Sequence, residues 1–91
     1  MRGEKRDANE AEIVQVLRDA GRSVELLPGG NGRPDLLVGW ARSRIVLMEV
    51  KTPKGNLEPD QVTWHRNWRG MPVVVVRSPA EALSATGVVI G

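Results

Sequence analysis

The spacing of apolar residues in the first third of the chain predicts a helix followed by a short strand. Between residues 9 and 20, Ile13, Val14 and Leu17 recur at the three- and four-residue spacing of one helix face. Gly21 follows directly, and glycine commonly ends a helix because it adopts a left-handed backbone easily. Residues 23–27 then have the composition of a strand, and the glycine- and proline-rich residues 28–34 predict a loop.

The middle and end of the chain continue with four strands and two helices. Residues 35–40 and 44–51 are apolar runs joined by three residues, which is typical of a β-hairpin. A second helix should begin at Pro59 and close before Gly70, because proline fits the first helical position. Residues 72–77 predict a strand apolar on both faces, residues 78–84 a short helix with Ser78 as its N-cap, and residues 88–90 an edge strand. The fold class is therefore α/β, in the order αβββαβ, with a mixed sheet flanked by helices.

The hairpin brings two carboxylates to one end of the sheet. A three-residue loop pairs Leu37 with Leu47 and Val38 with Val46, and the same register sets Asp35 opposite Glu49. Lys51 shares the face of Glu49, because side chains alternate along a strand. A two- or four-residue loop would instead move Glu49 to the opposite face from Asp35.

Two interpretations fit this group of charges. Lys51 neutralises Asp35 and Glu49 at a strand end, or the two carboxylates bind a divalent cation. Hard oxygen ligands suit Mg²⁺ or Mn²⁺, and Lys51 would then stabilise charge on a phosphate or orient the attacking water.

The two longer helices add further polar candidates. Glu10 extends the apolar stripe of the first helix and Glu12 points outward, so Glu10 is either a third metal-site carboxylate or a first-turn acid that stabilises the helix dipole. Gln61 belongs to the site or closes a capping box at the N-terminus of the second helix. His65, on the same stripe, is expected to be packed or half-exposed.

Other side chains of this region have mainly structural interpretations. Trp64 and Trp68 are expected in the core, because they are two of the three aromatic side chains with which this chain could fill it. Arg66 and Arg69 form a solvated face or contact phosphate. The Gly29–Gly32 segment, which delivers Arg33 next to Asp35, would allow a substrate backbone to approach closely.

Composition narrows the chemistry. The 91 residues form a single domain, with a core at about residues 8–85, and lack any cysteine, which excludes disulfides, thiolate metal sites and a cysteine nucleophile. One histidine excludes a histidine-rich zinc site. The net charge is only +2, but ten of the thirteen basic residues are arginine, which suits forked phosphate contacts. No apolar run approaches a membrane span or a secretory signal, so we expect a cytoplasmic protein without a membrane partner.

The motifs together resemble one nuclease family. Gly32-Arg33-Pro34-Asp35, the hairpin and Glu49-Val50-Lys51 resemble the PD-(D/E)xK signature, and residues 51–61 with the strand at 73–78 are similar to the virus-type replication-repair nuclease domain, VRR-NUC. The resemblance implies a restriction-endonuclease-like fold and a Mg²⁺- or Mn²⁺-dependent DNA endonuclease. By motif, Asp35, Glu49, the Val50 carbonyl and Glu10 would bind metal, and Lys51 and Gln61 would assist catalysis.

Stand-alone members of this size resemble phage and prophage proteins, in a bacterial or phage-infected cytoplasm. They look like homodimeric nucleases of the Holliday-junction resolvase kind, which act on branched or duplex DNA. Arg33, Lys54, Arg66 and Arg69 are the candidate DNA contacts. Two alternatives remain: a non-catalytic DNA-binding or assembly module that keeps the fold, and a restriction or end-processing nuclease.

Overall fold

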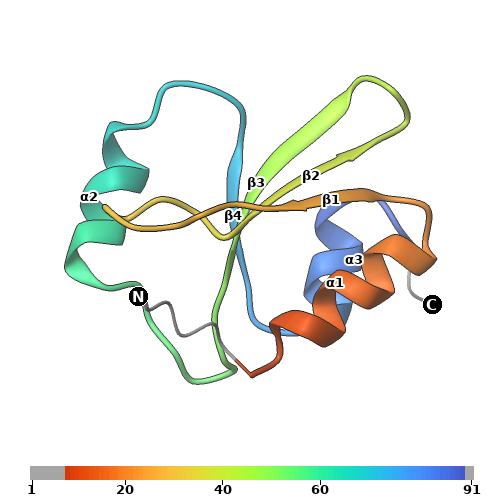
Figure 1. The fold of residues 1–91 in the computed structure, drawn as a ribbon, viewed down its shortest axis with the longest axis horizontal. Helices are drawn as coiled ribbons and strands as arrows, with labels where there is room; N and C mark the ends of the chain where they lie inside the picture. Colours follow the sequence, from red (N-terminus) through yellow and green to blue (C-terminus); the bar gives the residue numbers. More distant parts are fainter. Residues whose placement is uncertain (1–7, 90–91) are drawn as a thin grey trace.

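The computed structural model describes residues 8–89. Seven elements follow in the expected order: α1 Glu10–Asp19, β1 Ser23–Leu26, β2 Leu36–Trp40, β3 Arg44–Val50, α2 Pro59–Asn67, β4 Val73–Val76 and α3 Pro79–Ala85. Figure 1 shows α1 and α3 together on one side of the sheet and α2 apart from them on the other side. Within residues 8–89, no helix is both long and apolar enough to cross a membrane.

One mixed sheet organises the molecule, with its strands in the order β1-β2-β3-β4. The first three strands are antiparallel, and β4 lies parallel to β3. The hairpin register is the predicted one, with Leu37 opposite Leu47 and Val38 opposite Val46. The α/β fold class and the mixed sheet are therefore confirmed.

The core lies between the sheet and the pair of helices α1 and α3, and it is aliphatic. Alternate residues of β2 and β3 enter it, and Ile13 and Leu17 of α1 cover them. The expectation that Trp64 and Trp68 fill the core is wrong: α2 has no buried residue, and Trp68 is 37% exposed. The apolar face of α2 is too weak for burial, so the two indoles stack on each other, with ring centroids 4.7 Å apart.

The ends of several elements differ from the predictions. The helix α2 stops at Asn67, because Trp68 is already extended and its indole N–H donates to the Met71 carbonyl. Ser78 caps α3 as expected, since its hydroxyl accepts the Glu81 N–H at 3.1 Å. Residues 88–89 are not in a strand, and Ile90 of the predicted edge strand lies outside the described residues, as do residues 1–7 and 91 of the predicted domain.

Candidate active site

Asp35 lies directly before β2 and is fixed to β3 by two hydrogen bonds. Its backbone N–H donates to the Met48 carbonyl at 3.1 Å, and its Oδ2 accepts the Val50 N–H at 2.8 Å. The last cross-strand pair is Leu36 with Met48, so Asp35 does not form the predicted pair with Glu49. The carboxylate accepts a backbone N–H of β3 instead, which stabilises its charge where a direct pair would set two like charges against each other.

Glu49 is the most deeply buried acid among the described residues that carry the site, with only 1% of its surface exposed. Its Oε2 accepts a hydrogen bond from Gln61 Nε2 at 3.0 Å, and Lys51 Nζ lies 3.9 Å from the same oxygen. A buried carboxylate needs such partners, because desolvation of an unpaired charge is costly. Glu49, Lys51 and Gln61 are therefore brought together as predicted.

Gln61 satisfies both of its interpretations at once. Its Oε1 accepts the Glu58 N–H at 2.8 Å, which is the return bond of a capping box at the start of α2. Its Nε2 donates to Glu49. The Gln61 side chain thus caps the start of α2 and also reaches the buried carboxylate of Glu49. The position of Gln61 at the site is therefore coupled to the first turn of the helix.

The first helix contributes through Asn9 and Glu10. Glu10 is buried, with 4% exposed, whereas Glu12 is exposed, as the helical spacing predicted. Asn9, which the sequence argument missed, donates from Nδ2 to the carbonyls of Lys51 at 3.1 Å and Arg77 at 3.2 Å. Asparagine at an N-cap position was a visible signal, but its side chain joins α1 to the ends of β3 and β4 rather than capping the helix.

The donor set fits a hard divalent cation, although not with three acids. The carboxylate of Asp35 comes from directly before β2, and the carboxylate of Glu49 and the carbonyl of Val50 come from β3. All three are oxygen ligands of the kind that Mg²⁺ and Mn²⁺ take. Within residues 8–89, no three acidic, histidine or cysteine side chains gather into a metal-holding group. Glu10 therefore does not complete a three-carboxylate cluster with Asp35 and Glu49.

His65 lies one turn beyond Gln61 on α2. Its burial, and to a smaller degree the charge of Lys51, lowers the pKa of the imidazole below 6.5. Its ring packs edge-on against Trp64, with centroids 6.1 Å apart. The imidazole is thus partly buried, as expected, and favours its neutral form beside the site.

The last glycine of the loop between β1 and β2, Gly32, packs against helix α2. Gly32 is buried with φ +81°, and a Cβ there would overlap the Asp60 carbonyl oxygen and lie 3.0 Å from Trp64 Cβ. The loop thus packs on the first turns of α2, which carry Gln61. The space at Gly32 is therefore taken by α2, whereas an added Cβ at Gly29 or Gly30 would have nothing within 4 Å, so close approach of a substrate backbone to the segment stays a prediction.

The four basic side chains predicted to contact DNA are all exposed. Arg33 donates to the Gly29 carbonyl at 3.4 Å within its own loop, and Arg69 donates to the Arg66 carbonyl at 2.9 Å. Lys54 lies in the loop between β3 and α2. Arg33 lies in the loop before β2, Arg66 in α2 and Arg69 just after α2.

Comparison with known proteins decides the family. The family model "VRR-NUC domain" matches residues 3–80. The chain belongs to the VRR-NUC family. It is also similar to a solved structure described as a VRR_NUC domain, with 27% identity, a TM-score of 0.68, and coverage of 88% of this chain and 96% of that one. No curated protein matches. The match confirms the family and the restriction-endonuclease-like class of fold, and a nuclease domain implies DNA as substrate.

Proposed function

We propose that this VRR-NUC protein is a Mg²⁺- or Mn²⁺-dependent, structure-specific DNA endonuclease of the Holliday-junction resolvase kind, acting as a homodimer. The observation that supports it best is the single oxygen of Glu49, Oε2, approached by both Gln61 Nε2 and Lys51 Nζ. Asp35, whose carboxylate accepts the amide N–H of Val50, the residue after Glu49, supplies a second carboxylate. The dimer and the branched substrate come from the family resemblance.

In this proposal the metal, when bound by Asp35, Glu49 and the Val50 carbonyl, supplies Lewis acidity and orients water. The Lys51 ammonium lies 3.9 Å from Glu49 Oε2. A phosphate held at Glu49 would therefore lie near this ammonium, which stabilises the negative charge that develops on it. Gln61 holds Glu49 in one orientation through its 3.0 Å hydrogen bond. Arg33, Lys54, Arg66 and Arg69 hold the DNA backbone, and Glu10 supports the site from α1.

The test is a cleavage assay on a four-way junction, a flap and a linear duplex, with Mg²⁺, Mn²⁺ or chelator. Asp35→Asn, Glu49→Gln and Lys51→Ala should each abolish cutting while circular dichroism stays unchanged. Glu12→Gln, an exposed acid of α1 outside the site, is the matched control and should cut like the wild type.

The outcomes separate the alternatives. Failure of the folded protein to cut any substrate would refute a nuclease, and junction binding insensitive to chelator and to Asp35→Asn would favour a non-catalytic module. Sequence-specific cutting of linear duplex would favour a restriction or end-processing enzyme. Sedimentation equilibrium with and without junction tests the dimer.

A further inference from the structure

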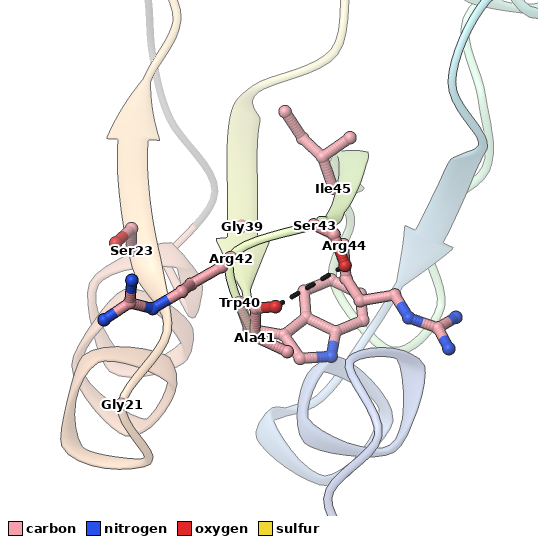
Figure 2. A pocket seen from close by; sticks show the side chains of 9 residues that line it. All are labelled: Gly21, Ser23, Gly39, Trp40, Ala41, Arg42, Ser43, Arg44 and Ile45. Carbon is pink, nitrogen blue, oxygen red and sulfur yellow. Dashed lines mark hydrogen bonds between the residues drawn. The ribbon is translucent and has the colours of Figure 1, made fainter.

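A pocket of mixed polar and apolar lining lies at the far end of the sheet, around the turn between β2 and β3. It has a volume of about 570 Å³ and is lined by Gly21, Ser23 and the hairpin residues 39–45 (Figure 2). The catalytic candidates Asp35, Glu49 and Lys51 do not line it. The pocket is therefore separate from the site described above.

The floor of this pocket belongs to the sheet face that carries Glu49 and Lys51. Ser23 pairs with Gly39, and Gly39 pairs with Ile45, so these three residues form one row across three strands. Along β3, Ile45 and Glu49 lie on the same face, because side chains alternate. Figure 2 shows Ile45 pointing away from the helices and Trp40 pointing toward them. A ligand lying on this face can reach both places.

Arg42 provides the charge at the rim. Its side chain reaches across the pocket toward Ser23, whereas Arg44 points to the other side of the turn (Figure 2). Among the described residues, no hydrogen bond or ion pair involves the Arg42 guanidinium. Arg22, by contrast, is held by Thr86 and lies over the Trp40 ring. Arg42 is thus an available cation above a floor that holds the Ser23 hydroxyl and the Gly39 backbone.

Gly39 keeps the floor open. A Cβ at this position would meet only the Arg44 carbonyl oxygen, at an ordinary 3.5 Å, so the backbone tolerates a side chain there. The absence of a side chain leaves the peptide surface between Ser23 and Ile45 accessible to a ligand. The turn itself holds Ala41 and Arg42 in the left-handed region, at φ 53° and 64°, which fixes the direction in which Arg42 leaves it.

We infer that this pocket, which we call the hairpin cradle (Ser23, Gly39 and Arg42), binds a backbone phosphate of the DNA that the active site cuts. The inference rests on the proposed function, since it assumes a DNA substrate. Arginine and a hydroxyl are typical phosphate partners, and such contacts position DNA without reading its sequence. The cradle adds a binding site that the predicted contacts Arg33, Lys54, Arg66 and Arg69 do not include.

The spacing suits one strand of duplex DNA. Ile45 and Glu49 are four residues apart, or about 13 Å at the rise of a strand. One strand of B-DNA carries a phosphate per ~3.4 Å of helix axis and also winds around that axis, so the bound phosphate lies only a few nucleotides from the scissile one. Glu25, on the same face of β1, disfavours a path over β1 and directs the backbone along β2 and β3.

The test measures DNA affinity by fluorescence anisotropy in chelator, on a labelled junction and a labelled duplex, from 50 to 300 mM salt. Arg42→Gln removes the guanidinium, and Arg44→Gln is the matched control on the same turn. Gly39→Glu fills the cradle and adds a negative charge, and Gly39→Gln fills it without the charge, so the two variants separate size from charge. Thermal melting by circular dichroism verifies that each variant is folded.

One phosphate contact contributes about 0.9 to the slope of log affinity against log salt, which corresponds to roughly eightfold affinity at 0.1 M salt. The slope for Arg42→Gln should be smaller by that amount and its affinity should fall by about that factor, and Gly39→Glu should weaken binding at least as much. Arg44→Gln should change affinity by at most about twofold, and Gly39→Gln, which fills the cradle without a negative charge, should weaken binding less than Gly39→Glu does. Equal slopes for Arg42→Gln, Arg44→Gln and the wild type would overturn the cradle.

The two proposals fail in different ways. Metal-dependent cutting by the wild type, combined with an unchanged slope for Arg42→Gln, overturns the cradle alone. A slope that depends on Arg42, combined with no cutting in Mg²⁺ or Mn²⁺, supports the cradle as a DNA site and overturns the proposed nuclease.

Discussion

Replacement of Gly32 by alanine should weaken both the fold and the active site, although Gly32 touches no catalytic candidate. The added Cβ would overlap the Asp60 carbonyl oxygen and lie 2.7 Å from the Asp60 carbonyl carbon and 3.0 Å from Trp64 Cβ. Carbon atoms pack best at about 3.5–4.0 Å, so the loop and the first turn of α2 must separate by about 1 Å. That turn carries Gln61, whose 3.0 Å bond to Glu49 would lengthen.

The loss of folding stability in Gly32→Ala has two parts, backbone strain and steric overlap, and the matched variant Gly30→Ala separates them. Gly30 shares the loop and the left-handed backbone, with φ +83° against +81° for Gly32, but a Cβ at Gly30 meets nothing within 4 Å. In either variant the left-handed backbone costs alanine about 1–2 kcal/mol of stability. Alanine also lowers the conformational entropy of the unfolded chain, which offsets about 0.4–1 kcal/mol of that loss. The overlap at Gly32 alone adds about 1–3 kcal/mol.

Urea unfolding followed by circular dichroism measures these differences, and tryptophan fluorescence reports on Trp64. A chain of this size has a free energy of unfolding of about 5–14 kcal/mol, so Gly32→Ala should remain folded in most of that range. A shift of about 1 Å at a catalytic group lowers turnover up to ~100-fold, and we expect cleavage by Gly32→Ala to fall by 10- to 100-fold. Equal stability and equal cleavage for Gly32→Ala and Gly30→Ala would refute the reasoning.

Three further perturbations test other contacts. Asn9→Ala removes the donor to the Lys51 and Arg77 carbonyls and should lower the free energy of unfolding by about 1–3 kcal/mol in urea melts, whereas exposed Asn56→Ala should not change it. Ser78→Ala removes the α3 cap and should cost about 1 kcal/mol, with exposed Ser84→Ala as control; equal melting temperatures would contradict the cap. Burial, and less strongly the charge of Lys51, lowers the pKa of His65, so protonation disfavours the folded state. Stability should therefore fall as pH drops through 6.5, and His65→Gln should flatten that fall.

The hairpin was predictable because its register depends on local chemistry. A three-residue loop and an apolar face together permit few alignments, since a slip by one residue would move Val38 and Val46 out of the core. The approach of Lys51 to Glu49 then follows from strand alternation. The burial of Glu10 followed likewise from helical spacing, which places it on the stripe of Ile13 and Val14.

Features that depend on tertiary docking were not predictable in the same way. The hydrogen bond from the Val50 amide to Asp35 ends the ladder one residue earlier than a regular register implies. The role of Gly32 depends on where α2 lies, which no periodicity specifies. Trp64 and Trp68 were misplaced for the same reason: helical spacing indicates that two aromatics share a face, but not whether that face meets the core.

The unequal packing of the two halves of the site has a dynamic consequence. Glu49 belongs to a central strand that is buried along its second half, whereas Gln61 belongs to a helix with no buried residue, set apart from α1 and α3 (Figure 1). Segments with little buried apolar surface open locally at lower free energy than core strands do. Amide exchange should therefore be faster in α2 than in β3. Because Gln61 both caps α2 and bonds Glu49, each opening of the first turn of the helix would also release the buried carboxylate, so helix docking and site assembly are one event.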